Sequence, residues 1–161
     1  MNASEKSVLD ACCGSRMMWF NPQHPATLFV DNRSENAQLC DGRILSVKPD
    51  IVADFRCLPF ENERFFLVVF DPPHLLRAGA RSWLSLKYGK LNKSTWQDDI
   101  RQGFTECWRV LKPYGTLIFK WSEVQITLNN VLPLMPAEPL FGFRRGRSIF
   151  VVLHKAPGLN S

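Results

Sequence analysis

The feature that most constrains the fold is Phe65–Phe70, a run of six apolar residues that reads FFLVVF. A strand with one wet face would alternate apolar and polar residues, whereas this run favours a strand buried on both faces. Such strands are typical of parallel sheets covered by helices. The run ends abruptly at Asp71, Pro72 and Pro73, and two adjacent prolines make a stiff corner. The sequence therefore predicts an α/β protein whose central strand carries a rigid corner at its carboxyl end.

Strand signals recur along the chain with helical or loop segments between them, which favours a largely parallel sheet. The apolar positions of Gln97–Leu111 fall on one stripe and predict the clearest helix, and a second helix is expected from Glu123 to about Leu132. The last two strands should form an antiparallel hairpin with a basic tip. The expected strands are Ser7–Ala11, Thr27–Asp31, Asp50–Ala53, Phe65–Phe70, Thr116–Trp121, Leu140–Arg144 and Ser148–His154.

Composition narrows the class of protein. A chain of 161 residues without repeats is expected to be one domain, residues 1–161. No apolar run approaches the ~20 residues of a membrane span, and the opening MNASEKS lacks an apolar signal-peptide core, so we expect a cytoplasmic protein. The five cysteines have no CxxC spacing, which argues against a disulfide framework or a metal site. The net charge of +5 is compatible with a polyanionic partner.

Acidic residues follow the first three expected strands. Asp10 ends the first and precedes a turn that contains Cys12 and Gly14, Asp31 ends the second, and Asp54 follows the third. Each acid alone has an ordinary explanation, because Asp is a common helix N-cap and a single glycine turn is usually structural. A dinucleotide GxGxxG pattern is absent. A fourth acidic residue, Asp71, follows FLVVF, and chance is a poor explanation for four acids at the ends of four strands. Ligands of open α/β sheets bind at these carboxyl ends of the strands.

These stretches resemble the class I S-adenosylmethionine-dependent methyltransferases over nearly the whole chain. VLDACCG resembles the first motif of the family, LFVDNR the second, ADFRCLPF the third, and WRVLKPYGTLIF the passage before the fifth strand. The resemblance implies a seven-stranded Rossmann-like sheet with helices on both faces and an antiparallel last strand. It also implies S-adenosyl-L-methionine as cofactor. The residues expected to bind this cofactor are Asp10, Cys12, Gly14, Asp31, Asp54, Phe55 and Leu58.

The DPPH of FLVVFDPPH resembles the [DNS]PP[YFWH] motif of methyltransferases that act on amino nitrogens of nucleobases. An amino group on an aromatic ring is a poor nucleophile because its lone pair is delocalised. The Asp71 carboxylate and the Pro72 carbonyl can accept hydrogen bonds from its two N–H groups and favour a tetrahedral nitrogen. His74 is expected to stack on the target base or to shuttle a proton. A methyltransferase acting at pyrimidine carbon 5 would need a cysteine at the place that His74 occupies.

Basic and aromatic residues indicate how a nucleic acid would be held. The segment after His74 interleaves cations with aromatic residues, and the hairpin tip adds three arginines, as nucleic-acid grooves do. A solvated loop with anchoring aromatics is the ordinary alternative. The chain is too short for a separate target-recognition domain, so a partner subunit could supply recognition. The expected substrate-binding residues are Pro73, Lys87, Tyr88, Arg144, Arg145 and Arg147.

The sequence therefore predicts a methyltransferase with Asp71, Pro72 and His74 as catalytic residues and an amino nitrogen of DNA or RNA, adenine N6 or similar, as target. Two alternatives stay open. The substrate could be a small molecule or a protein side chain, or the chain could be a non-catalytic partner subunit that keeps the fold.

Overall fold

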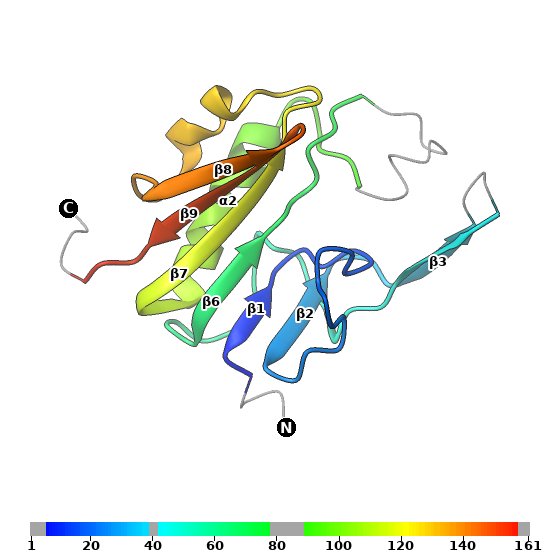
Figure 1. Cartoon of the computed structure of the whole chain (residues 1–161), viewed down its shortest axis with the longest axis horizontal. Helices are drawn as coiled ribbons and strands as arrows, with labels where there is room; N and C mark the ends of the chain where they lie inside the picture. Colours follow the sequence, from blue (N-terminus) through cyan, green and yellow to red (C-terminus); the bar gives the residue numbers. More distant parts are fainter. Residues whose placement is uncertain (1–5, 39–41, 78–88, 158–161) are drawn as a thin grey trace.

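The computed structural model describes residues 6–38, 42–77 and 89–157. Seven strands form one sheet in the order β5-β2-β1-β6-β7-β9-β8 (Figure 1). All neighbouring pairs are parallel except those of β9, which runs antiparallel to both β7 and β8. The predicted sheet and its single antiparallel strand are confirmed. The strands are β1 (Val8–Asp10), β2 (Thr27–Asp31), β5 (Ile51–Val52), β6 (Phe65–Phe70), β7 (Leu111–Ser122), β8 (Phe141–Arg145) and β9 (Ser148–His154).

The helix α2 (Trp96–Val110) packs on one face of the sheet and matches the predicted Gln97–Leu111 within one residue. Its buried stripe contributes Phe104 to a cluster of rings with Phe70 and Phe119, whose centroids lie 5.3 and 4.8 Å from that of Phe104. The Lys155 ammonium donates to the carbonyls of Trp108 and Leu111 and so satisfies the carboxyl end of the helix. The core between α2 and the sheet is thus largely aromatic.

The second predicted helix is wrong. Between β7 and β8 the chain forms two short 3₁₀ helices, η2 (Leu128–Asn130) and η3 (Leu132–Leu134). The Glu123 carboxylate accepts the N–H of Leu128, and Pro133 has no N–H to continue an α-helix. The buried Val131 and Leu134 join the core on the α2 side.

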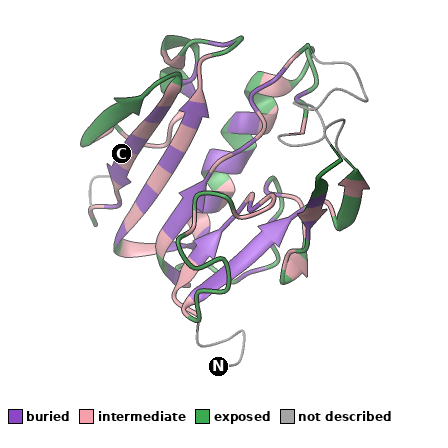
Figure 2. Ribbon diagram, turned by 45° about the vertical axis from the view of Figure 1, so that its right-hand side comes forward, coloured by how far each residue is buried: buried purple, intermediate pink, exposed green. Residues whose placement is uncertain are grey.

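Helices on both faces were expected, but in the described residues every helix packs on the face that α2 covers. Over β1 and β2 the opposite face is covered by turns of residues 11–26, where the Trp19 ring meets Phe29 edge-on. Over β7 and β9 the described residues leave that face more open. Residues that face α2 are buried and those on the opposite face are mostly half-buried, while β8 is exposed throughout (Figure 2). In the part of the chain that the structure describes, the sheet thus carries helices on the α2 face and turns on the opposite face over β1 and β2.

A two-stranded hairpin, β3 (Glu35–Gln38) and β4 (Ile44–Val47), lies between β2 and β5 in the sequence and was not predicted. Its sequence signal was the dipeptide Asp41-Gly42, which favours a tight hairpin turn. In the described part of the chain, no helix is long and apolar enough to cross a membrane.

Candidate active site

A cavity of about 300 Å³ opens at the carboxyl edge of the parallel strands. This volume falls in the range of small-molecule sites, and the place is the one where open α/β sheets bind ligands. Its walls come from the ends of β1, β2, β6 and β7 and from the segment after β5. The described lining residues are Ala11, Cys12, Cys13, Gly14, Ser15, Met17, Met18, Asp31, Asn32, Arg33, Phe55, Asp71, Pro72, Pro73, His74, Gly89, Lys90 and Lys120.

The turn after β1 is tied to the end of β2. The Gly14 N–H donates to Asp31 Oδ2 at 2.9 Å, while Asp31 Oδ1 accepts from the backbone N–H and the Nε of Arg33. Gly14 has a φ of +48°, a conformation that residues with a Cβ rarely adopt, and no atom lies within 4 Å of the place a Cβ would take. The turn therefore leaves an unobstructed backbone surface beside a carboxylate.

Asp10 lies beneath this turn and is fully buried. The Trp19 indole N–H donates to its Oδ2 at 2.7 Å, and the Cys12 N–H donates to its Oδ1. Burial raises the pKa of Asp10 to about 7, and the neighbouring Asp71 carboxylate adds to the rise while the indole N–H opposes it. Asp10 thus stabilises the turn through the Cys12 N–H and does not itself line the cavity.

Asp71 follows β6 directly and opens into the cavity with 24% of its side chain exposed. The Lys120 ammonium, near the carboxyl end of β7, donates to Asp71 Oδ2 at 2.7 Å. Desolvation raises the pKa of the Asp71 carboxyl, and the positive charge of Lys120 opposes that rise. In the described residues Oδ1 accepts no hydrogen bond, so one carboxylate oxygen remains available to a ligand.

The proline corner is held from several sides. A Cβ on Gly89 would lie 3.2 Å from Pro73 Cγ, so the backbone of Gly89 packs closely on the proline ring. The buried Leu75 accepts the N–H of Leu91 at its carbonyl. The Gln125 side chain then accepts the N–H groups of the two residues after Leu75 and donates to the carbonyl of Arg77. These contacts keep the corner at the cavity wall.

His74 lines the cavity but is only 7% exposed, with its ring edge-on to Trp121 at 6.3 Å between centroids. Burial and the positive charge of Lys120 lower the pKa of His74 to about 4. The imidazole is therefore neutral at neutral pH and a weak base. It is suited to contact a flat ring rather than to shuttle a proton.

The cavity brings together eight of the predicted residues, from Cys12, Gly14 and Asp31 to Asp71–His74, with Phe55 among them. Besides Asp10, two of the predicted cofactor-binding residues lie outside the cavity. The Asp54 carboxylate is held by the Arg56 guanidinium, which also pairs with Asp99, and Asp54 is not among the lining residues. Leu58 is 4% exposed in the core and donates its N–H to Glu106.

The predicted substrate-binding residues fare differently. Lys87 and Tyr88 lie outside the described residues. Arg144, Arg145 and Arg147 all lie at the β8–β9 hairpin, on the carboxyl edge of the sheet but outside the cavity. The Arg144 guanidinium pairs with Glu123 Oε2 at 2.7 Å.

Lys120 is the main site residue that sequence reasoning missed. A single lysine inside the apolar strand LIFKW is the signal that could have pointed to it, because a charge there needs a partner. Met17, Met18 and Arg33 also line the cavity and carried no comparable signal. Burial raises the pKa of the Cys12 thiol well above its usual range and that of Cys13 to about 12, so both thiols are neutral and poor nucleophiles. Among the described residues no cluster of His, Cys, Asp and Glu could hold a metal ion.

No protein-family model and no curated protein matches the sequence. Solved structures do match the fold. PH0226 from Pyrococcus horikoshii OT3 is 18% identical, with 92% of this chain and 81% of that chain covered and a TM-score of 0.60. TrmN from Thermus thermophilus is 19% identical, with 94% and 44% covered and a TM-score of 0.58. A geranyl diphosphate methyltransferase in complex with GPP and sinefungin is 10% identical, with 95% and 72% covered and a TM-score of 0.57. The chain thus has the Rossmann-like fold found in S-adenosylmethionine-dependent methyltransferases.

Proposed function

We propose that this protein is an S-adenosylmethionine-dependent methyltransferase that methylates an exocyclic amino nitrogen of a nucleobase in DNA or RNA. One observation carries the proposal. The rigid corner of Asp71 and Pro72 opens into the same cavity as the Gly14 turn and the Asp31 carboxylate. An acceptor for an amine and a site for a nucleoside cofactor therefore adjoin.

The cavity fits the nucleoside part of the cofactor. Asp31 ends β2 and has carboxylate oxygens that can accept from ribose hydroxyls, and the turn at Cys12 and Gly14, which lines the cavity, allows close approach of a ligand. Phe55 supplies an apolar ring to the wall. Asp54 and Leu58 contribute only through the position of Phe55, because neither lines the cavity. When bound, S-adenosylmethionine would supply a sulfonium-activated methyl group, which can pass to a nitrogen lone pair as the sulfur–methyl bond breaks and a neutral thioether leaves.

The protein residues prepare the nitrogen. Asp71 Oδ1 and the Pro72 carbonyl each accept an N–H of the amine, which draws its lone pair out of conjugation and aims it. The nitrogen gains one carbon bond and sheds one proton. The Asp71 carboxylate takes that proton, a role that its raised pKa favours. Lys120 keeps Oδ2 occupied and so fixes the orientation of the carboxylate.

The test is incubation with methyl-labelled cofactor and separate pools of DNA, tRNA and rRNA, followed by mass spectrometry of the nucleosides. We expect a methylated amino group of adenine or cytosine. Asp71→Asn should lower turnover about 10²- to 10⁴-fold, the usual range for loss of a positioned base, with cofactor binding retained. Asp98→Asn removes a surface carboxylate of α2 that, among the described residues, forms an ion pair with Arg101 and no other, and it is the matched control.

Label found only at pyrimidine carbon 5, or on protein, would contradict the proposed chemistry. The geranyl diphosphate methyltransferase has a similar fold and a substrate that is not a nucleobase, so a panel of small molecules belongs in the same assay. If the protein binds the cofactor but no substrate pool consumes it, and Asp71→Asn changes nothing, the chain is a non-catalytic partner subunit.

A further inference from the structure

The open face of the sheet carries a row of side chains that leads away from the cavity. In the register of the strands, Lys120 of β7 lies opposite Phe150 of β9, and Phe150 lies opposite Phe143 of β8. Side chains of directly paired residues share one face, so all three project on the side away from α2. The row therefore begins at the ion pair of Asp71 and Lys120 and ends at the edge strand.

The far end of this row is aromatic and exposed. The rings of Phe143 and Phe150 are stacked, with 4.9 Å between centroids and 8° between planes. Phe143 is 56% exposed, and Phe141, two residues earlier on the same face of β8, is 62% exposed. Flat rings left open to water on a sheet are suited to stack on unpaired bases.

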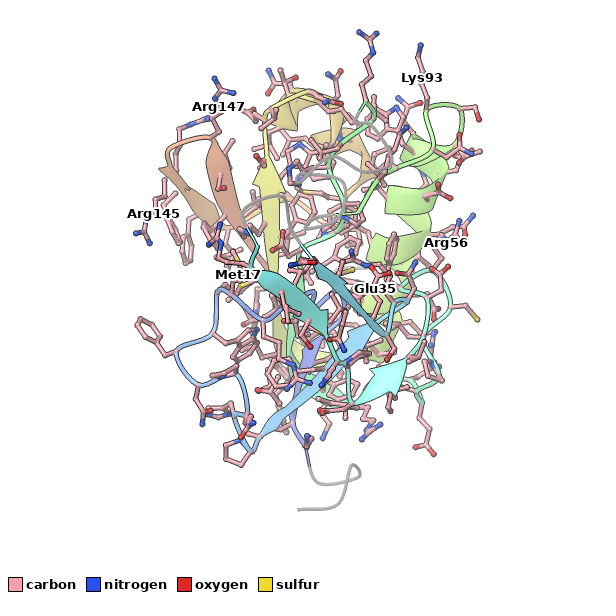
Figure 3. The ribbon with its side chains drawn as sticks, turned by 90° about the vertical axis from the view of Figure 1, so that its right-hand side faces the viewer. Met17, Glu35, Arg56, Lys93, Arg145 and Arg147 are labelled. Atoms are coloured by element: carbon pink, nitrogen blue, oxygen red, sulfur yellow. The ribbon has the colours of Figure 1, made fainter. Side chains whose placement is uncertain are left out.

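Unpaired positive charge lies beside these rings. Arg145 is on the same face of β8 as Phe143, and Arg147 follows in the turn; both are exposed. Within the described part of the chain neither guanidinium pairs with a carboxylate, unlike Arg144, which is bound to Glu123. Figure 3 shows Arg145 and Arg147 reaching outward on the side of the sheet away from α2. The charge is complementary to a phosphate backbone and unsuited to a second copy of the same basic face.

We propose that this face, made by Phe141, Phe143, Phe150, Arg145 and Arg147, binds a single-stranded nucleic acid next to the nucleotide whose base enters the cavity. The inference rests on the proposed function and names its substrate class. Phe143 lies two strands from Lys120, roughly 10 Å, which one or two nucleotides can bridge. A duplex keeps its bases stacked on one another and cannot use the rings. The face therefore selects single strands.

The test measures the anisotropy of fluorescein-labelled 12-mers, as single-stranded RNA, single-stranded DNA and duplex, without cofactor. Single strands should bind at least tenfold more tightly than the duplex, and the RNA and DNA arms identify which strand is preferred. Phe143→Ala should weaken binding about tenfold, within the usual range for one stacked base. Arg145→Ala should lower the slope of log affinity against log salt by about 0.7.

Matched controls come from the same molecule. Tyr114→Ala removes an aromatic ring that is 72% exposed at the opposite end of β7, and Arg101→Ala removes an exposed arginine of α2. Neither should change binding. Phe143→Leu separates stacking from apolar contact, since leucine keeps an apolar side chain but offers no flat ring to a base. All variants are compared by circular dichroism and thermal melting.

Equal binding by Phe143→Ala and Tyr114→Ala, equal binding of duplex and single strand, or no binding of any oligonucleotide would overturn the inference. Retention of full affinity for the single strand by Phe143→Leu would also overturn it, because the ring would then contribute no stacking. Methyl transfer is scored separately. If the protein methylates oligonucleotides and Phe143→Ala leaves kcat/KM unchanged, the proposed binding face is refuted but the proposed function is not. If strands bind through Phe143 but are never methylated, the proposed function alone is refuted.

Discussion

Lys120 Nζ lies 2.7 Å from Asp71 Oδ2, and the two residues come from neighbouring strands at the mouth of the cavity. The pair has both side chains partly exposed, at 21% and 24%. It leaves Oδ1 without a hydrogen-bond donor among the described residues, and the positive charge of Lys120 favours the ionised carboxylate. Several outcomes depend on this contact and on the residues packed around it.

Lys120→Met should shift the pH profile of methyl transfer. The ammonium opposes the rise in the pKa of Asp71, so its removal lets that pKa climb further. Because the proposed mechanism requires the ionised carboxylate, the acidic limb of kcat/KM should move to higher pH by about 1 unit or more. Lys120→Arg should restore most of the original profile. Lys112→Met, in which the lost ammonium sits over the Phe66 ring at the other end of β7, is the control. An unshifted limb in Lys120→Met would show that the pair does not set the charge of Asp71.

Asp31→Asn and Asp54→Asn form a matched pair of substitutions for cofactor binding. Asp31 lines the cavity, whereas Asp54 is occupied by Arg56. Loss of a charged acceptor costs about 1.5–3 kcal/mol, so Asp31→Asn should raise the Kd for S-adenosylmethionine at least tenfold. Asp54→Asn should change it less than about threefold, under 1 kcal/mol. Isothermal titration calorimetry measures both. The opposite order would place the ribose at Asp54.

His74→Gln should remove an acid-sensitive part of the stability. The pKa of His74 is about 4 in the folded protein and 6.5 without the fold, so the unfolded chain binds more protons between these values. The unfolding free energy contributed by this group is complete above pH 6.5 and is lost as the pH falls towards 4. The full shift corresponds to about 3 kcal/mol. Urea unfolding of both proteins between pH 4 and 7.5 should show a stability difference that narrows in acid; a constant difference would contradict the buried neutral ring.

Gly103→Ala should displace the aromatic rings that pack between α2 and the cavity. Glycine in an exposed helix usually gains about 1 kcal/mol from replacement by alanine. At Gly103, however, a Cβ would lie 2.5 Å from Phe70 Cζ and 2.7 Å from Phe55 Cδ2. The displaced Phe55 ring should weaken cofactor binding, and the melting temperature should fall. Gln102→Ala, at an exposed position of the same helix, should leave both unchanged. A rise in melting temperature in Gly103→Ala would mean that the rings make room without cost.

The sequence alone determined the sheet and the position of the acidic residues at its edge. Apolar runs such as Phe65–Phe70 leave few alternatives to buried parallel strands, and each ending acid then falls at the same edge. The stripe of α2 was equally readable, because its period is local. By contrast, the segment after Ser122 has helical composition, yet the side-chain acceptor of Glu123 and Pro133 direct it into 3₁₀ turns.

Only the tertiary structure decided which of those acids face the cavity and with what charge. Asp10 and Asp54 look equivalent to Asp31 in the sequence, but Trp19 covers the first and Arg56 holds the second. The partnership of Asp71 with Lys120 spans 49 positions of the chain. Likewise, the row from Lys120 to Phe143 exists only through the pairing of three strands. Contacts between distant residues depend on register and packing, which local patterns of apolar and polar residues do not encode.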